Sequence, residues 1–239
     1  MKKPKKSLSQ NFLKDKNICQ KIVNLTEISN KIVVEIGPGY GFMTDIILEK
    51  NPLKLILIEK DNYLVNYLNE KYRKYQNIEI IKKDILNYDF KHYGNLVIIS
   101  NLPYNVSTKI ILYLFNFNQN ILEMIFMVQK EVASKFDYRL PKMNKYKFLT
   151  KIVSSFNICF DVSPKVFFPK PKVYSTVVRF KIKKNKFDLS KAHNFSKLIF
   201  RNIRKKICNN INLKNLDRLS NKRVDQLTIK ELLKIYNFF

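Results

Sequence analysis

Four consecutive residues, Asn101, Leu102, Pro103 and Tyr104, combine groups that could do chemistry. They follow LVIIS (96–100), an apolar run long enough to be a buried strand. A loop that only reversed the chain would more naturally use Gly, Asp or Ser. The amide oxygen of Asn101 and a backbone carbonyl such as that of Leu102 can accept both hydrogens of an amino group. Pro103 fixes the backbone and removes a competing donor, and the Tyr104 ring offers a surface for stacking a base.

The glycines, scarce elsewhere, gather in one stretch. Three of the four in the chain fall in EIGPGYG (35–41), between an apolar run and a segment of helical length. Gly37, Gly39 and Gly41 allow a tight turn and a close approach of the backbone to a ligand, and a strand–helix turn without a ligand is the alternative. The spacing is G-x-G-x-G, not the G-x-G-x-x-G of dinucleotide enzymes. With Glu35 before it, the stretch resembles the cofactor loop of class I S-adenosylmethionine-dependent methyltransferases.

Two acidic residues complete a predicted cofactor pocket. Glu59 closes the second apolar run, 22 positions after Gly37, where a carboxylate can accept hydrogen bonds from ribose hydroxyls. Asp84 ends the third run and is suitably placed for the exocyclic amine of a bound adenine. Either acid could instead be a helix N-cap. Because all lie at the carboxyl ends of successive predicted strands, where open α/β sheets bind ligands, we expect a nucleoside-type pocket there.

The elements that must position these residues alternate between strands and helices. Continuous apolar runs separated by helical segments predict a parallel sheet covered on both faces. The fold class is therefore α/β, with a Rossmann-like sheet. A strand pair at or near a sheet edge is predicted after the βα repeats. The predicted strands are 31–36, 54–59, 78–82, 96–100 and 124–129, the intervening helices 41–50, 61–72 and 107–116, and the later pair 150–162 and 173–182.

Beyond Lys184 the chain predicts helices over 190–211 and 228–238, the second opened by a capping box of Thr228 and Glu231. We therefore expect two domains. Residues 1–184 would form a methyltransferase domain with a basic N-terminal segment, 1–16, and residues 185–239 a small basic helical domain.

The charge balance predicts a polyanionic partner. The chain carries 45 Lys and Arg against 19 Asp and Glu, a net charge of +26, and its last 59 residues hold 16 against 4. Nucleic acid is favoured over a membrane surface; a nucleotide bias in the coding genome is the alternative source of the lysines.

Composition predicts a soluble cytoplasmic protein without a metal site. Cys19, Cys159 and Cys208 are far apart and lack metal-ligand spacing, which is typical of reduced cysteines. The N-terminus has no apolar signal core, and no apolar stretch reaches membrane-spanning length. His92 and His193 lie in no motif and are given no role.

The NLPY stretch resembles the catalytic loop of enzymes that methylate exocyclic amino groups. The N6 lone pair of adenine is delocalised into the ring and is a poor nucleophile. Acceptors from Asn101 and Leu102 would favour a pyramidal nitrogen, as preorganised dipoles acting on developing charge. No general base is required, because the methylated nitrogen is acidic enough to lose its proton to water.

Over nearly its whole length the chain resembles the KsgA/Erm family of rRNA adenine dimethylases, on the KsgA side. The motifs that carry the resemblance are, in order, KKSLSQNFLKD, VVEIGPGYGFMT, LIEKD, NLPYNVST, MVQKEVA, FFPKPKVYSTVVRF and FRNIRKKICNNI. The resemblance implies S-adenosylmethionine as cofactor and dimethylation of two adjacent adenosines in the 3′-terminal hairpin of small-subunit rRNA. A monomer acting on the pre-30S particle is expected.

The resemblance also implies roles for particular residues. Phe167 would face Tyr104 across the target adenine, with ordinary core as its alternative. Asn11 and Leu13 would join the cofactor site, and a basic helix would contact RNA phosphates. The implied cofactor-binding residues are Asn11, Leu13, Gly37, Gly39, Glu59, Asp84 and Asn101, and the implied RNA-binding residues are Arg201, Arg204, Lys205 and Lys206.

Other functions remain open on the sequence. Ser9, in SQNFL, is similar to the Erm branch, which methylates large-subunit rRNA, and NKYKFLT (144–150) replaces the family's Y-G-R-L-S. A DNA adenine methyltransferase is less favoured, because no separate target-recognition domain is visible. A catalytically idle ribosome assembly factor would require an inert pocket.

Overall fold

The structure, a computed structural model, describes residues 11–184, 187–211, 219 and 221–239. Most of the predicted N-terminal basic segment, including Ser9, lies outside the described residues. The chain divides into two compact units, one of residues 1–133 and 157–182 and the other of residues 134–156 and 183–239. The sequence analysis placed one domain boundary, near residue 184, and this boundary stays a prediction. In the structure the second unit also contains residues 134–156.

The first unit is built on a seven-stranded sheet in the order β4-β3-β2-β5-β6-β9-β7. The five strands from β4 to β6 are parallel, and β9 runs antiparallel to β6. The strands are β2 (Ile32–Ile36), β3 (Lys54–Glu59), β4 (Ile78–Lys82), β5 (Leu96–Asn101), β6 (Ile121–Gln129), β7 (Ser154–Val162) and β9 (Ser175–Ile182). The parallel sheet and the late strand pair at its edge confirm the predicted fold class.

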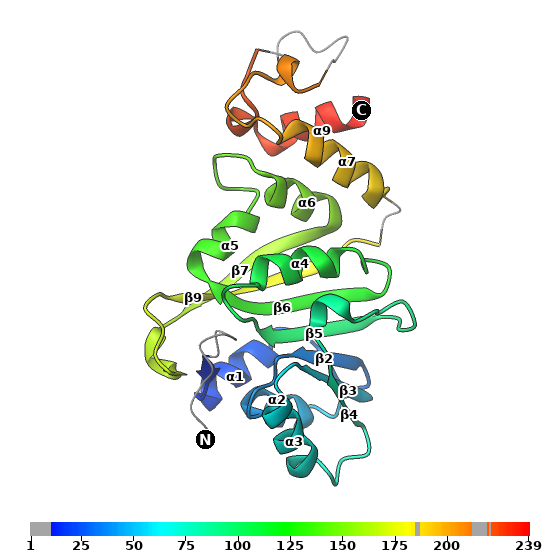
Figure 1. Ribbon diagram of the computed structural model, residues 1–239, viewed down its shortest axis with the longest axis vertical. Helices are drawn as coiled ribbons and strands as arrows, with labels where there is room; N and C mark the ends of the chain where they lie inside the picture. The colour runs from blue at the N-terminus through cyan, green and yellow to red at the C-terminus, as the bar shows by residue number, and fades with distance from the viewer. Residues whose placement is uncertain (1–10, 185–186, 212–218, 220) are drawn as a thin grey trace. The chain divides into compact units, whose positions relative to one another are not determined.

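Helices join the parallel strands, as Figure 1 shows. β3 is buried from Leu55 to Glu59, as a strand covered on both faces should be. An aspartate opens α1 and another opens α3: Asp15 accepts from the backbone N–H of Ile18, and Asp61 from that of Tyr63. The helices of this region are α1 (Lys16–Val23), α2 (Phe42–Leu48), α3 (Asn62–Lys71) and α4 (Ser107–Phe115).

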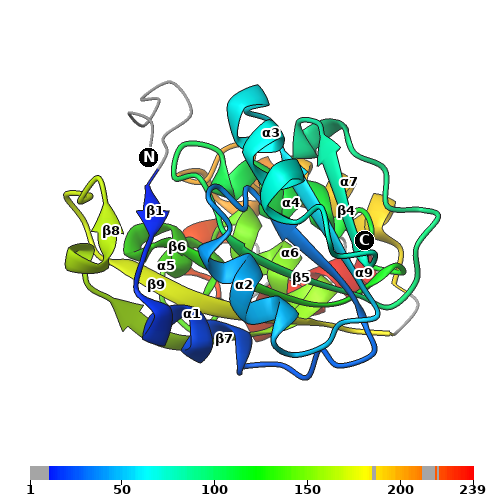
Figure 2. The ribbon, with the colours of Figure 1, turned by 90° about the horizontal axis from the view of Figure 1, so that it is seen from below.

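A short second sheet lies beside the first. β1 (Phe12–Leu13) pairs antiparallel with β8 (Phe167–Phe168), so that Phe12 is opposite Phe168 and Leu13 is opposite Phe167. Figure 2 shows these two strands side by side. The pairing brings the N-terminal segment next to a part of the chain more than 150 residues away.

The second unit is held together by aromatic packing between its helices. Phe148 of α6 lies with its ring centroid 5.1 Å from that of Phe195 in α7 and 5.3 Å from that of Tyr236 in α9. The predicted capping box is present at the start of α9, where Thr228 and Glu231 exchange hydrogen bonds. Among the described residues of this unit, the longest helices are α6 (Lys145–Val153), α7 (Leu189–Ile199) and α9 (Ile229–Phe238), and α5 (Lys130–Phe136) begins in the first unit.

Two predicted elements differ from the structure by more than three residues at one end. Residues 150–153 are the last turn of α6, not strand, and the Thr150 hydroxyl donates to the Tyr146 carbonyl one turn back. The helix predicted over 190–211 ends at Ile199 and is followed by turns. Like charges at spacings of three and four, as in RNIRKK (201–206), disfavour a helix. The Asn210 amide instead donates, at 3.2 Å, to the Ile199 carbonyl, which has no partner within the helix.

Candidate functional site: a pocket at the carboxyl ends of the parallel strands

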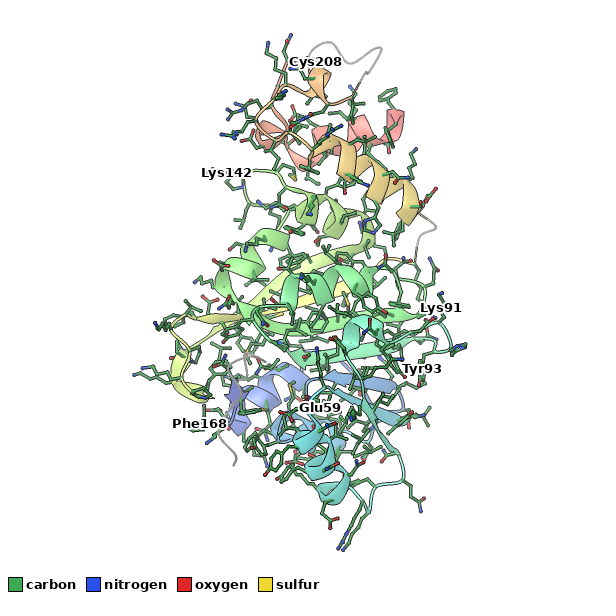
Figure 3. All side chains as sticks on the ribbon, viewed as in Figure 1. Glu59, Lys91, Tyr93, Lys142, Phe168 and Cys208 are labelled. Atoms are coloured by element: carbon green, nitrogen blue, oxygen red, sulfur yellow. The ribbon has the colours of Figure 1, made fainter. Side chains whose placement is uncertain are left out.

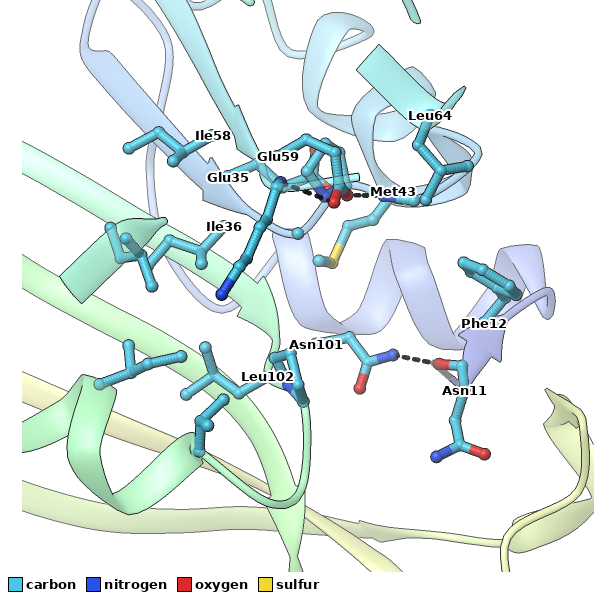
Figure 4. Close-up of a pocket in the computed structure, with 18 of the residues that line it drawn as sticks. Asn11, Phe12, Glu35, Ile36, Met43, Ile58, Glu59, Leu64, Asn101 and Leu102 are labelled. Carbon is cyan, nitrogen blue, oxygen red and sulfur yellow. Dashed lines mark hydrogen bonds between the residues drawn. The ribbon is translucent and has the colours of Figure 1, made fainter. Parts of the chain in front are cut away.

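A pocket of about 210 Å³ opens where the parallel strands of the first unit end. Gly37 follows β2, Glu59 ends β3, Asp84 follows β4 and Asn101 ends β5, and all four line the pocket. Figure 4 shows Glu59 and Asn101 projecting toward the same space from opposite sides. The structure therefore brings together the acidic residues, the glycine loop and the NLPY loop, as the sequence predicts.

The glycine loop is shaped by close contacts with neighbouring side chains. Gly39 has φ +61°, and a Cβ there would lie 2.8 Å from the Phe12 ring. Gly41, the residue before α2, has φ +77°, and a Cβ would lie 2.2 Å from the Tyr72 hydroxyl. Either alanine would therefore combine an unfavourable backbone conformation with a clash. At Gly37 a Cβ would meet no atom within 4 Å, because this residue faces the open pocket.

Two residues at the end of α3 hold this loop from behind. The Lys71 ammonium donates to the carbonyl oxygens of Tyr40, at 3.1 Å, and Gly41, at 3.3 Å, and to the Asp45 carboxylate, at 2.8 Å. The Tyr72 hydroxyl lies 3.0 Å from the Gly41 carbonyl and 2.7 Å from the other Asp45 oxygen. We call Lys71 and Tyr72 the loop clamp. No sequence motif marked it, since its residues are over 25 positions from the loop they hold.

Glu59 presents a largely buried carboxylate. One oxygen accepts from the backbone N–H groups of Lys60, at 2.8 Å, and Asp61, at 2.9 Å. The other is 3.4 Å from the Gly39 N–H, a long contact that leaves acceptor capacity. Burial raises the pKa of Glu59, and these three backbone hydrogen bonds work in the opposite direction. The carboxylate is therefore oriented by the chain before any ligand arrives.

Asp84 combines the two roles that the sequence offered. One carboxylate oxygen accepts from the Leu86 N–H at 3.1 Å and so caps a short 3₁₀ helix, Ile85–Asn87. The other pairs with the Lys60 ammonium at 2.7 Å. This hydrogen bond lowers the pKa of Asp84 below its ordinary value. Asp84 also lines the pocket, so the cap and the predicted ligand contact are compatible.

Asn101 is fixed at its nitrogen end and open at its oxygen end. The Nδ2 group donates to the Asn11 carbonyl oxygen at 2.8 Å. Because a carbonyl can only accept, this bond fixes which end of the amide faces the pocket. The Oδ1 atom is buried, and within the described residues no donor reaches it. A buried acceptor left without a partner is unfavourable by about 1–3 kcal/mol, which marks it as a site for a ligand donor.

The rest of the NLPY loop is tied to its surroundings. The Leu102 N–H donates to the Met127 carbonyl at 3.1 Å, fixing the backbone between Asn101 and Pro103. The Tyr104 and Ser175 hydroxyls are 2.8 Å apart. Burial raises the pKa of Tyr104, so its phenol stays neutral. Leu102, Pro103 and Tyr104 all line the pocket.

Phe167 and Leu13 pair across β1 and β8 and lie in the main hydrophobic core, each 5% exposed. Leu13 also lines the pocket, whereas Phe167 is absent from the lining residues. The structure thus places Phe167 in the core environment that the sequence left open, and its role at the target base stays a prediction. Its neighbour Phe168 is 45% exposed.

The lining also includes residues to which the sequence assigned no role. Glu35 precedes the glycine loop, is 2% exposed, and accepts from the Thr44 hydroxyl at 2.6 Å. Burial raises its pKa from 4.5 to about 8. Apolar walls come from Ile58, Leu64 and Ile85. An acid before a glycine loop was visible in the sequence, but its burial depends on α2 and could not be read there.

The four predicted RNA-binding residues belong to the second unit. Arg201, Arg204, Lys205 and Lys206 are all exposed and follow α7 in non-helical chain, where Lys206 forms an isolated β-bridge with Arg223. The Lys206 ammonium reaches the Asn221 side-chain oxygen at 3.2 Å. These cations are presented on irregular backbone rather than on the helix that the resemblance implied.

The residues of the pocket fit S-adenosylmethionine. Gly37 leaves open space beside the backbone, Glu59 and Asp84 offer acceptors for a nucleoside, and apolar side chains line the walls. Over the described part of the chain, no three His, Cys, Asp or Glu side chains are grouped to hold a metal, and no helix is long and apolar enough to cross a membrane.

Sheet order and pocket position define a class I methyltransferase fold. Solved structures agree: 23S rRNA methyltransferase ErmE superposes with a TM-score of 0.79 at 19% identity over 95% of this chain and 98% of that one. A dimethyladenosine transferase from Plasmodium falciparum gives 0.79 at 22% identity, over 95% and 100%. A family model for ribosomal RNA adenine dimethylase matches residues 1–239, and the chain belongs to this family of methyltransferases.

Two curated relatives have a higher sequence identity to this chain than these two solved structures have. The chain is 41% identical over 202 residues to "Ribosomal RNA small subunit methyltransferase A" of Malacoplasma penetrans, covering 81% of this chain and 70% of that protein. It is 38% identical over 205 residues to the protein of the same name from Pelagibacter ubique, covering 82% and 77%.

Proposed function

We propose that this chain transfers methyl groups from S-adenosylmethionine to N6 of two adjacent adenosines in the 3′-terminal hairpin of small-subunit rRNA. It would act in the cytoplasm, as a monomer, on the pre-30S particle. Membership of the dimethylase family supports the reaction, and relatives named for the small subunit, at 38–41% identity, support the target.

The observation that carries the proposal is the buried, unpartnered Oδ1 of Asn101. It lies at the end of β5, in the same pocket as Glu59 and the glycine loop. An amino group of a base brings the hydrogen that this oxygen lacks. The site is therefore preorganised for an amino group and needs no rearrangement of its own acceptor.

Separate groups of residues would act on the methyl donor and on the target base. When bound, S-adenosylmethionine supplies an electrophilic methyl group. Asn101 Oδ1 and the Leu102 carbonyl accept the two amino hydrogens, which localises the nitrogen lone pair for attack. The Tyr104 ring, fixed by its hydroxyl contact with Ser175, stacks on the target base. After transfer the nitrogen releases a proton to water, and a second round gives the dimethylated base.

The cofactor would be held by the acidic residues and by the segment that follows the N-terminus. Glu59 accepts from ribose hydroxyls, and Asp84 accepts from the adenine amine. Gly37 and Gly39 let the backbone approach the ligand, while Asn11 and Leu13 close the pocket from β1 and the residue before it. The hydrogen bond from the Asn101 amide to the Asn11 carbonyl therefore joins a residue that contacts the target base to a residue that contacts the cofactor.

The decisive experiment offers two substrates to the purified protein with methyl-labelled S-adenosylmethionine. One is small ribosomal subunits isolated without their adenine dimethylation, and the other is protein-free large-subunit rRNA. We expect label in the small subunit alone, mapped by nuclease digestion to two adjacent N6,N6-dimethyladenosines.

Each other outcome selects a different function. Label in large-subunit rRNA alone would contradict the proposal and assign an Erm-like activity. Binding of subunits without label in either substrate would indicate an assembly factor with an idle pocket.

A further inference from the structure

An exposed segment that the proposed mechanism leaves unused lies next to the pocket. Residues 165–174, KVFFPKPKVY, hold three lysines and no acid. Phe168, Val173 and Tyr174 are 45%, 44% and 56% exposed. A group of exposed apolar side chains marks an interaction site more often than a single one does. We call this stretch the 165–174 segment.

Two connections tie the segment to the pocket. At its start, Phe168 pairs across the short sheet with Phe12, which lines the pocket. At its end, Tyr174 directly precedes Ser175, whose hydroxyl contacts that of Tyr104. Consecutive Cα atoms lie about 3.8 Å apart, so Tyr174 begins within about one nucleotide of the proposed target base. The exposed rings, one of which Figure 3 labels at Phe168, therefore border the place where the target adenosine would enter.

The charges around the segment match a phosphate backbone. Lys165, Lys170 and Lys172 are exposed. The ammonium of Lys14, also exposed, lies 4.3 Å from the centroid of the Phe168 ring. Exposed rings interleaved with cations are the arrangement that binds single-stranded nucleic acid, because bases stack on the rings while phosphates meet the cations.

We propose that the 165–174 segment binds the unpaired nucleotides that flank the target adenosine, with Phe168 and Tyr174 stacking on neighbouring bases, a proposal that rests on the function given above. A target base can enter the pocket only if it leaves its own stack, which exposes the faces of its neighbours. Aromatic side chains at the pocket's border replace that lost stacking. Lys170 and Lys172 contact the phosphates between these bases.

The test uses the full chain and a short RNA of the target hairpin with 2-aminopurine next to the target adenosine. Stacking on an aromatic ring quenches 2-aminopurine fluorescence. Wild-type protein should quench it, and Phe168→Ala or Tyr174→Ala should reduce the quenching and weaken binding about tenfold. Phe168→Trp and Tyr174→Phe should keep both. Tyr75→Ala serves as the control, because Tyr75 is 49% exposed and precedes β4, at the opposite edge of the sheet.

A second measurement addresses the lysines. Lys170→Gln with Lys172→Gln should lower the salt dependence of binding to this RNA by about 0.7 for each phosphate that is no longer neutralised, the value for single strands. Lys50→Gln with Lys74→Gln, two exposed lysines in the connections that precede β3 and β4, should leave the salt dependence unchanged.

The outcomes separate this proposal from the proposed function. If the alanine variants quench and bind like wild type, or if wild type gives no quenching, the stacking platform is overturned, whether or not small subunits are methylated. If quenching is lost in the variants but wild type methylates no rRNA, the platform stands as an RNA-binding surface and the proposed function fails.

Discussion

The two ends of the Asn101 amide do different things, and this division explains why an asparagine stands there. Its nitrogen end donates to the Asn11 carbonyl, which ties β5 to the N-terminal side of the pocket. Its oxygen end is thereby turned into the pocket as a buried acceptor. Aspartate could not make the first bond without a proton, and alanine can make neither.

Asn101→Ala should therefore remove transition-state stabilisation. We expect kcat to fall about 100- to 1000-fold, as when one preorganised polar group is removed from an active site. Binding to the small subunit should change little. Asn118→Ala is the matched control, since the Asn118 amide also donates to a backbone carbonyl, that of Phe115 at 3.1 Å, but in the segment before β6. Loss of subunit binding in the Asn101 variant would show instead that the loop has a structural role.

Glu35 predicts a pH dependence of stability. Burial raises its pKa from 4.5 to about 8 in the folded chain. The folded state therefore keeps a proton that the unfolded state loses. This contribution to stability is fully present below about pH 4.5 and is lost as the pH rises toward 8. Between those values, the unfolding free energy of the ligand-free protein should fall relative to that of Glu35→Gln, by at most about 1.4 kcal/mol per pH unit.

Denaturant unfolding of both proteins at several pH values from about 5 to 8 measures this difference. Glu70→Gln provides the comparison, because the Glu70 side chain is 74% exposed. If the unfolding free energies of wild type and Glu35→Gln change with pH in parallel, the Glu35 carboxylate is ionised throughout. Burial would then not raise its pKa.

At the scale of elements, the loop clamp shows how a helix end can position a cofactor loop. Tyr72 and Lys71 fix the Gly41 carbonyl and Asp45, and thereby the start of α2. The glycine loop has three residues at positive φ, and these contacts hold it in one conformation. Less conformational entropy is therefore lost when a ligand binds.

Tyr72→Phe should weaken cofactor binding without affecting the chemical step. One hydroxyl bond contributes about 0.5–1.5 kcal/mol, so we expect the Kd for S-adenosylmethionine to rise about twofold to tenfold. The value of kcat at saturating cofactor should stay unchanged. Calorimetry and initial rates measure the two quantities. A fall in kcat with an unchanged Kd would mean that the clamp acts on the target base rather than on the cofactor loop.

Several elements could be predicted because their signals are local. β3 and β4 have the predicted bounds, since their apolar runs end at charged or polar residues. The Thr228 capping box was visible because it spans four residues. The end of α7 was missed because an amide eleven residues away, that of Asn210, donates to its last carbonyl, that of Ile199. The loop clamp and the buried state of Glu35 depend in the same way on tertiary packing, which one sequence does not reveal.

At the scale of the whole molecule, charge is distributed over both units. The net charge of +26 attracts RNA over a long range whatever the position of individual cations. Binding that depends on position needs exposed cations at the RNA interface. Arg204, Lys205 and Lys206 of the second unit are exposed and consecutive, and are proposed as such an anchor.

Replacing Arg204, Lys205 and Lys206 with Glu should therefore weaken small-subunit binding and flatten its salt dependence. Removing one cation from a phosphate lowers the slope of log K against log salt by about 0.7 for a single strand to 0.9 for a duplex, so removing three changes it by about 2 to 3. The control replaces Lys50, Arg73 and Lys74, exposed residues of the first unit, with Glu and changes the net charge equally. Filter binding from about 50 to 200 mM salt measures both sets. An equal loss of affinity in both triple variants would mean that long-range attraction dominates. If the variant at Arg204, Lys205 and Lys206 binds like wild type, the anchor lies elsewhere.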